Sequence, residues 1–423
     1  MKDKGGLGRF VTARTVSILG DRLAETALPI VILLATGDAL VAGLVTAANV
    51  APTFLISLPV GDWVDRSERR RLMITADLWR AGLSAILAFA LLAPYPSAAV
   101  LILVSFLLGC GDVVFNVSSQ SYLPALVPST RIMRANTVLE TGDAAATLGG
   151  PALAGVVITR FSASVAVALN AVSFLLSAVL LLRLPNSRTS PAAREKDLDR
   201  SERPGRFAEM TAGVRLLLRD PTQRLLQLGG AYLYLAAGSA GIMVISVAVQ
   251  ELRLSTVEVG LLLSAAGIGG LAVGFVIARL VERAPWGPLL GTAVLGIGLT
   301  CVWLAFSGGF GTAFAAVLLM DGFSALAFIT VGSARQIFTP AALLGRLTAA
   351  TGIVNGTVRT LGAAGGGALV LALGARGACL ALGLCGVAAA VPLLLAPTAR
   401  TAMANGQADE GSTPADTRTA TDA

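Results

Sequence analysis

Residues 61–72 read GDWVDRSERRRL and separate two apolar segments, 40–61 and 72–93. Each segment is long enough to cross a bilayer, because roughly 20 apolar residues of α-helix span about 30 Å of hydrocarbon. Arg69, Arg70 and Arg71 would hold the connecting loop on the cytoplasmic side, where membrane proteins concentrate positive charge. The stretch therefore predicts two membrane-spanning helices joined by a short cytoplasmic loop.

The rest of the chain has the same apolar character. Of its 423 residues, 55% are hydrophobic and 13% are charged, and the mean hydropathy is +0.77. One soluble core cannot bury that much apolar surface, since cores stop growing at about 250–300 residues. The 47 glycines suit membrane helices that approach closely through small residues. We predict an all-α membrane protein with about twelve transmembrane helices, at 11–34, 40–61, 72–93, 97–119, 135–158, 163–183, 224–248, 258–279, 288–307, 311–334, 348–373 and 377–397.

The basic residues are distributed unevenly along this topology. If the N-terminus is cytoplasmic, 26 of the 32 Lys and Arg residues fall at cytoplasmic helix ends, loops or tails. This asymmetry predicts a multi-pass protein of the inner (plasma) membrane with both termini cytoplasmic. The net charge of +7 is then a topology signal, and no nucleic-acid partner is expected. The exceptions are Arg160, Arg253 and Arg376 on the outer side, and Arg22, Arg80 and Arg359 within spans.

Residue types needed for metal or cofactor chemistry are scarce. The chain has no histidine, and its four cysteines lie within predicted spans without metal-binding spacing. The glycine-rich runs at 267–270 and 365–367 lack the strand before them and the Lys-Ser or Lys-Thr after them that a phosphate-binding loop needs. We expect no metal, no cofactor, no direct use of ATP and no enzymatic activity.

The longest internal polar stretch, from Pro185 to Arg206, divides the predicted spans six and six. Apolar positions at helical spacing over 207–218 then predict a short helix on the membrane surface. We assign an N-terminal six-helix half to 1–184, a cytoplasmic linker to 185–222, a C-terminal six-helix half to 223–397 and a disordered cytoplasmic tail to 398–423.

A shared register between the halves indicates a duplication. Gly61 is as far along the chain from Gly274 as Leu148 is from Leu361. Internal repeats of this kind are typical of secondary transporters, whose halves enclose a binding site near the middle of the membrane.

The loop at 61–72 resembles the signature loop of the major facilitator superfamily, which joins the second and third helices. The resemblance implies a major facilitator fold of two six-helix pseudo-repeats. It also implies that Gly61, Asp65, Arg66, Arg69 and Arg70 form a conformational latch at the cytoplasmic helix ends. Gly61 would remove a side chain where two helices cross. The alternative is that the run only anchors the loop by its charge.

The predicted fifth span reads ATLGGPALAG over 146–155. It is similar to the motif of antiporter members of the superfamily, with Ala at 146 and 154 in place of Gly. Gly150, Pro151 and Gly155 carry the match, and Pro151 should kink the helix because it lacks a backbone N–H. The alternative is an ordinary helix whose small residues serve packing.

Further stretches resemble the multidrug, macrolide and siderophore exporter branch: Phe115-Asn116, residues 122–128, residues 134–136 and residues 211–221. The resemblance covers about residues 10 to 397. One feature departs from it. Many drug–proton antiporters carry an Arg in the fourth helix, and this span has Asp112 instead, so a mechanism relying on that Arg does not transfer.

Ionisable residues inside spans are costly in lipid and usually face a cavity. Asp21 and Glu25 are four residues apart and lie on one face of the first span. Asp112 and Asn116 have the same spacing and share one face of the fourth span. In the resembled fold the first, fourth, seventh and tenth helices line the cavity. The predicted proton or substrate residues are Asp21, Glu25, Asp112, Asn116, Asp321, Tyr232 and Tyr234.

An acid shielded from water can alternate between protonated and charged forms, and a bound cation would compete with its proton. The competing interpretation is a buried structural pair, which we favour for Asp77 with Arg80 and keep open for Arg22 with Glu25. Farther along, Glu140 and Asp143 are candidates for gating pairs with Arg131 or Arg134.

These features predict a secondary active transporter that exports drug-like or other amphipathic small molecules by alternating access. Its predicted partners are the small-molecule substrate, the proton as the coupling ion, and membrane lipids. An alternative is a lipid-like or siderophore transporter without demonstrated proton coupling. Another is a non-transporting membrane sensor on the same scaffold, which the retained acids in the spans disfavour.

Overall fold

The structure is a computed structural model that describes residues 4–93, 96–128, 131–185, 214–281 and 284–397. The elements of these residues are helices. In the first part of the chain they are α1 (Lys4–Thr36), α2 (Ala39–Val50), α3 (Pro52–Leu55), α4 (Ser57–Arg66), α5 (Arg69–Ala90), α6 (Ala98–Leu126), α7 (Ile132–Arg160) and α8 (Ala163–Leu182). After the linker they are α11 (Pro221–Ser246), the π-helix η3 (Val247–Glu251), α12 (Thr256–Val281), α13 (Trp286–Ala305), α14 (Phe310–Ile337) and α15 (Ala341–Leu395).

Each predicted span falls on a helix of the described residues. Eight of these helices are long and apolar enough to cross a membrane, or nine if the bent second span is counted as one. The long α15 covers two predicted spans, with a break at Gly374. Gly374 has φ 73°, a left-handed conformation that glycine adopts without steric cost. The all-helical membrane fold is confirmed.

The second predicted span is not one continuous helix. Its parts Ala39–Leu55 and Ser57–Arg66 meet at an angle of 56°. Pro52 begins the short α3. Proline suits this position because the N–H of a first helical residue has no partner within its helix. Ile56, with φ −119°, separates α3 from α4. The prediction of a single helix over 40–61 is therefore wrong at this break.

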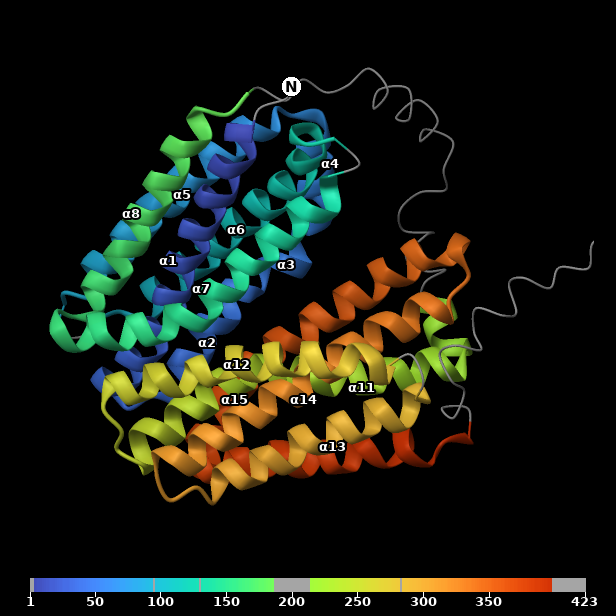
Figure 1. The fold of residues 1–423 in the computed structure, drawn as a ribbon. Helices are drawn as coiled ribbons and strands as arrows, with labels where there is room; N and C mark the ends of the chain where they lie inside the picture. Colours follow the sequence, from blue (N-terminus) through green and yellow to red (C-terminus); the bar gives the residue numbers. More distant parts are fainter. Residues whose placement is uncertain (1–3, 94–95, 129–130, 186–213, 282–283, 398–423) are drawn as a thin grey trace, which may run out of the picture.

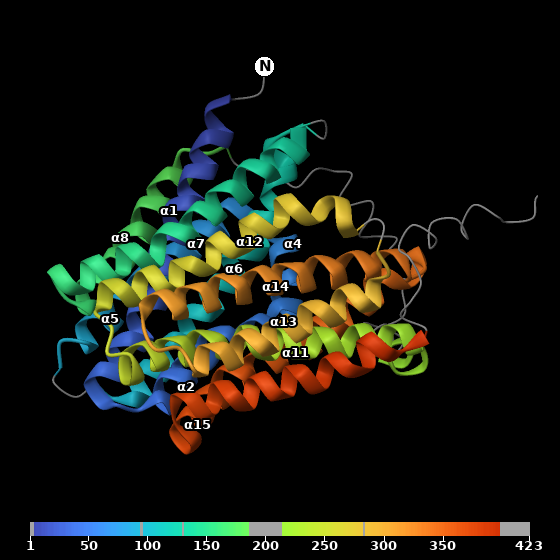
Figure 2. The same ribbon diagram turned by 60° about the horizontal axis from the view of Figure 1, so that its bottom comes forward.

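The described helices form two bundles (Figure 1), one of α1–α8 and one of α11–α15. We call the end bearing residues 66–69, 183–185 and 337–341 the linker end, and the end bearing 36–39, 160–163, 251–256 and 374 the far end. The bundles contact each other mainly through α7 with α12 and through α2 with α15. Figure 2 shows α12 running beside α7.

Small residues close the contact between the bundles on the far-end side. A Cβ atom at Gly43 of α2 would lie 2.6 Å from the carbonyl oxygen of Ala363 on α15. A Cβ atom at Gly155 of α7 would lie 2.6 Å from the carbonyl oxygen of Thr256 on α12. Towards the linker end the two bundles diverge (Figure 1). The bundles are therefore packed more closely at the far end than at the linker end.

The predicted surface helix lies partly outside the described residues. Residues 214–219 are helical, and Asp220 then caps α11 by accepting a hydrogen bond of 2.8 Å from the Thr222 N–H. The segment 186–213 and the tail 398–423 lie outside the described part of the chain.

Candidate substrate and coupling site

A buried arginine of α5 gathers three carboxylates from three helices. The Arg80 side chain is 2% exposed and forms an ion pair with Asp77, one turn earlier on α5. Its Nη1 lies 2.9 Å from Oδ1 of Asp112 on α6 and 3.8 Å from Oδ2 of Asp21 on α1. Asp77 and Arg80 are therefore a pair, but Arg80 also connects two of the acids predicted to face the cavity, Asp21 and Asp112.

Two aromatic rings hold the Arg80 guanidinium in place. Its central carbon lies 4.3 Å from the ring centre of Phe115 and 4.2 Å from that of Phe174. Cation–π contacts with desolvated rings contribute about 2 kcal/mol. The planar group is fixed between these rings while its edge faces the carboxylates.

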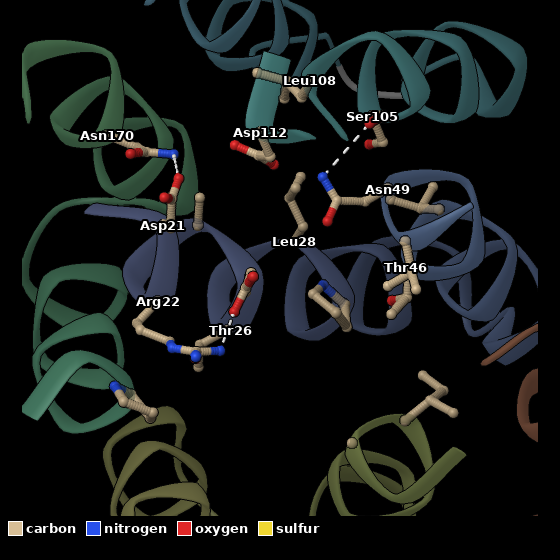
Figure 3. A pocket seen from close by; sticks show the side chains of 18 of the residues that line it. Asp21, Arg22, Thr26, Leu28, Thr46, Asn49, Ser105, Leu108, Asp112 and Asn170 are labelled. Atoms are coloured by element: carbon tan, nitrogen blue, oxygen red, sulfur yellow. Dashed lines mark hydrogen bonds and ion pairs between the residues drawn. The ribbon is translucent and has the colours of Figure 1, made fainter. Parts of the chain in front are cut away.

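Amide side chains complete the polar wall (Figure 3). Asn170 of α8 donates a hydrogen bond of 3.4 Å from Nδ2 to Oδ1 of Asp21. Ser173 donates from Oγ to the Asn170 backbone oxygen at 2.8 Å and so fixes this turn of α8. Asn49 of α2 donates to the backbone oxygen of Ser105 at 3.5 Å.

The carboxylates around Arg80 differ in their access to water. Asp77 is fully buried, whereas the side chains of Asp21 and Asp112 are 25% and 30% exposed. A separate pair, Arg22 with Glu25 at 2.8 Å, is neutral as a whole and more exposed. Arg80 thus faces more negative charge than it can balance, and the excess lies on the two acids that solvent can reach.

A cavity of about 390 Å³ lies between the two bundles, with Asp21 and Asp112 in its wall (Figure 3). Ligand pockets for drug-sized molecules occupy about 300–1,000 Å³. The N-terminal bundle supplies most of the polar lining: Asp21, Arg22, Glu25, Thr26, Thr46, Asn49, Ser84, Ser105, Asp112, Thr147 and Asn170.

In the described part of the C-terminal bundle, the cavity wall is apolar except at one position. Its lining residues on α11 and α12 are Ala237, Gly238, Gly241, Ile242, Ile245, Leu263 and Ala266. Arg359 of α15 completes it. The cavity therefore has one strongly polar wall and one apolar wall with a single charged side chain.

Four of the predicted cavity residues lie away from this cavity. Asp321 of α14 accepts a hydrogen bond of 2.8 Å from the Gly270 N–H on α12. Tyr232 is buried and donates to the Leu382 oxygen at 3.3 Å, and the Tyr234 ring packs edge-on against Phe328. Asn116 is exposed and is absent from the lining. These residues face neighbouring helices or the surface, so the structure brings together only Asp21, Glu25 and Asp112 of the predicted set.

The predicted gating pair has a different partner. Asp143 of α7 forms an ion pair of 3.1 Å with Arg14 of α1, instead of with Arg131 or Arg134. Arg14 also donates to Ser119 Oγ on α6 at 3.1 Å. Because α1 packs along α7, Arg14 reaches Asp143 from the adjacent helix, whereas residues 131 and 134 lie at the start of α7 itself.

The loop at 61–72 is tied to the N-terminal bundle. Arg70 donates from Nε to the Leu181 oxygen at 2.9 Å and also bonds the Leu182 oxygen, at the end of α8. Arg71 pairs with Glu68 at 2.5 Å. A Cβ atom at Gly61 would meet no described residue within 4 Å, so the described helices do not form the predicted close crossing at this glycine in this conformation.

The motif in α7 lies at the contact between the bundles. A Cβ atom at Gly150 would lie 2.4 Å from Cβ of Arg22 on α1, and Gly155 faces α12 as described above. Pro151 lies inside α7, and its carbonyl oxygen would be 2.4 Å from a Cβ atom at Gly260 of α12. Gly150 thus packs α7 against α1, while Pro151 and Gly155 pack it against the other bundle.

Two charged residues of the site, Arg80 and Arg359, are not among the cavity residues predicted from the sequence. The sequence predicts Arg80 only as part of a structural pair, and it places Arg359 in a span without a role. Both could have been found by the signal that selected the acids, since an ionisable group inside a span is a candidate for function.

Two helical bundles that enclose a charged cavity define a polytopic membrane transporter. The sequence profile of the Major Facilitator Superfamily matches residues 10–366, and the chain belongs to this superfamily.

Curated relatives include an exporter. The enterobactin exporter EntS of Shigella boydii serotype 4 (strain Sb227) is 25% identical over 364 residues, which cover 83% of this chain and 82% of the relative. The uncharacterized MFS-type transporter YfiS of Bacillus subtilis (strain 168) is 26% identical over 221 residues, covering 52% and 51% of the two chains.

Solved structures share the fold. A bacterial homologue of the human lysosomal transporter Spinster, in an inward-facing and unoccupied conformation, aligns with a TM-score of 0.72 and 15% identity over 98% of this chain and 100% of that one. A bacterial homologue of the iron transporter ferroportin, in an inward-facing state, aligns with a TM-score of 0.70 and 18% identity over 92% and 98%. The chain is a multi-span transporter of small molecules.

Proposed function

We propose that the protein is a secondary active exporter of amphipathic small molecules in the bacterial inner membrane, driven by proton antiport. The observation that carries this proposal is the sharing of Arg80 by Asp77, Asp112 and Asp21. Two of these three acids lie in the wall of the cavity.

The charge balance of the cluster supports coupling. One guanidinium balances one carboxylate, and uncompensated charge is costly inside a membrane. A proton on Asp21 or Asp112, or a cationic group of a substrate, would relieve the excess. Because the two compete for one site, binding of substrate would release a proton, and linkage makes the effect reciprocal.

The export direction rests on sequence similarity. The motif at 146–155 is similar to that of antiporter members of the superfamily, and the relative EntS is named as an exporter of enterobactin. A siderophore-like substrate is the second candidate, and this relative is the observation that favours it.

The proposed transport cycle uses the two halves, 1–184 and 223–397, as moving bodies joined by the linker 185–222. With both termini in the cytoplasm, as the charge asymmetry predicts, the linker end is cytoplasmic and the closely packed far end is extracellular. The structure then corresponds to a state open to the cytoplasm. Gly61, Asp65, Arg66, Arg69 and Arg70 would form their latch between the halves when this side closes.

Proton release on substrate addition tests the proposal. Protein in weakly buffered detergent receives a panel of cationic and neutral amphipathic drugs, and released protons are followed with a pH dye. We expect release by the parent, a decrease of more than half in Asp21→Asn, and unchanged release in Asp321→Asn, a matched control whose acid lies outside the cavity.

Each result has a consequence. Release that persists in Asp21→Asn but vanishes in Asp112→Asn moves the coupling acid to α6. If the parent binds drugs without releasing any proton, proton coupling is contradicted. Transport of a siderophore-like substrate with an energy source other than the proton gradient is then the remaining candidate.

A further inference from the structure

We infer that Arg359 binds an anionic group of the transported molecule, so that the preferred substrates are amphipathic molecules carrying a carboxylate, phenolate, sulfonate or phosphate. This inference rests on the proposed transport function and names the substrate class of the same cavity. Among the residues that the structure describes, Arg359 is the one charged side chain on the C-terminal wall of that cavity, and its neighbours there are apolar.

The position of Arg359 within a membrane span is costly unless water or an opposite charge meets its guanidinium. It lies within α15, in the first of the two predicted spans that this helix covers. A guanidinium at membrane depth is unfavourable unless it faces water or a partner of opposite charge. Such a residue marks a path for substrate or ions more often than a structural feature.

Arg359 has no partner within the described part of the chain. No hydrogen bond or ion pair engages its guanidinium there, whereas Arg22 on the opposite wall is paired with Glu25. Arg80, which lies outside the lining, is paired with its aspartates. Arg359 is also exposed and lines the cavity. A guanidinium offers five donors in a rigid fork that matches a carboxylate or phosphate oxygen pair.

The two walls would hold different parts of one molecule. An anionic head would bind Arg359, and its apolar body would lie against Ile242, Ile245 and Leu263 beside it. The acids on the opposite wall would disfavour a second negative charge and favour a proton or a cationic group. An anionic or zwitterionic amphipath fits this arrangement, whereas a purely cationic one meets unpaired positive charge on the C-terminal wall.

A matched set of fluorescent amphipaths tests the assignment at equilibrium. The probes are 11-(dansylamino)undecanoic acid, its methyl ester and the amine of the same chain length, and the full-length protein is held in nanodiscs of phosphatidylcholine. In the parent, the acid should bind about tenfold or more tightly than its ester, because a charged hydrogen bond is lost with the ester. In Arg359→Gln the acid and the ester should bind within about twofold of each other.

Two controls separate the assignment from loss of folding. The ester should bind Arg359→Gln as it binds the parent, and Arg359→Lys should retain part of the preference for the acid. Arg160→Gln removes an exposed positive charge at the far end of α7 and should leave the preference unchanged. Addition of anionic phosphatidylglycerol to the nanodiscs distinguishes a lipid headgroup from a free substrate, because only a lipid occupant would displace the acid probe.

Equal binding of acid and ester by the parent would overturn the inference, as would a preference that survives in Arg359→Gln. Failure of all three probes to bind would also overturn it. None of these measurements uses a gradient or proton release. A protein that prefers the acid but releases no proton would therefore retain this inference while contradicting proton coupling.

Discussion

Ser264 Oγ on α12 accepts a hydrogen bond of 3.1 Å from the backbone N–H of Ala152 on α7. The bond crosses from one bundle to the other, directly after Pro151. Proline interrupts the hydrogen bonding of its own helix, so backbone groups near a kink are available to a neighbouring helix. The motif in α7 therefore serves the contact between the bundles at the far end.

Enlarging a glycine in this contact should open the far end. In Gly260→Val the new side chain would collide with the Pro151 carbonyl oxygen, since even a Cβ atom would be 2.4 Å away. We expect a cysteine placed at Thr256 in a cysteine-free background to react several-fold faster with a membrane-impermeant maleimide.

Gly149→Val is the matched control for this experiment, because a Cβ atom there meets nothing within 4 Å. Its labelling rate should equal that of the unsubstituted background. Equal rates in both variants would show that α7 and α12 do not form the seal.

Removing the positive charge of Arg80 should destabilise the protein strongly. Arg80→Gln leaves three carboxylates without their guanidinium, and breaking a buried ion pair costs about 3–5 kcal/mol. Thermal unfolding in detergent should show a lowered Tm, with partial recovery in the double variant Arg80→Gln with Asp77→Asn. The Tm of Arg80→Lys should lie between those of the parent and of Arg80→Gln, because lysine keeps the positive charge and loses the contacts with both rings. A Tm of Arg80→Gln equal to that of the parent would refute the role of the cluster in holding α1, α5 and α6 together.

The ion pair between Arg14 and Asp143 should be detectable by charge exchange. Arg14→Asp and Asp143→Arg should each lower stability, and the double variant should recover about 1 kcal/mol, the scale expected for a partly exposed pair. The comparison is Arg131→Asp with Asp143→Arg, which should show no recovery. Recovery in the comparison alone would restore the pairing predicted from the sequence.

Gly61 should matter for transport and not for stability of the observed state. The space around it is open, so Gly61→Leu should leave the Tm within about 1 °C, as for a surface substitution away from special features. If α4 meets the other bundle when the linker end closes, the leucine will obstruct closure and lower the transport rate in proteoliposomes at least fivefold, with Gly61→Ala intermediate. Full transport by Gly61→Leu would exclude a close helix crossing at this residue.

Most of the fold could be predicted from the sequence because the bilayer imposes its thickness on every span. The apolar runs, the polar stretch after Pro185 and the break between 373 and 377 all follow from that constraint. The bend at Ile56 could not be predicted, since Pro52 is compatible with a straight helix start or with a kink, and neighbouring helices decide between them.

The site was predicted less completely because sequence identifies embedded charges but not the direction in which each helix turns them. Asp21 and Asp112 face one another through Arg80, whereas Asp321 turns towards Gly270, where the absence of a side chain exposes a backbone N–H. The pairing of Asp143 depended in the same way on which helix packs beside α7. Contacts between helices far apart in sequence carry this information, and no periodicity within one helix contains it.

The bend in the second span gives its two ends separate attachments. On the far-end side, α2 is fastened to α15 of the other bundle, whereas α4 packs mainly against α6 of its own. A change of the backbone torsions at Ile56 can therefore move the end of α4 at Arg66 without breaking the contacts of α2 with α15. Access from the linker end could then change while the far end stays packed, through a bend within one span in addition to any movement of whole bundles.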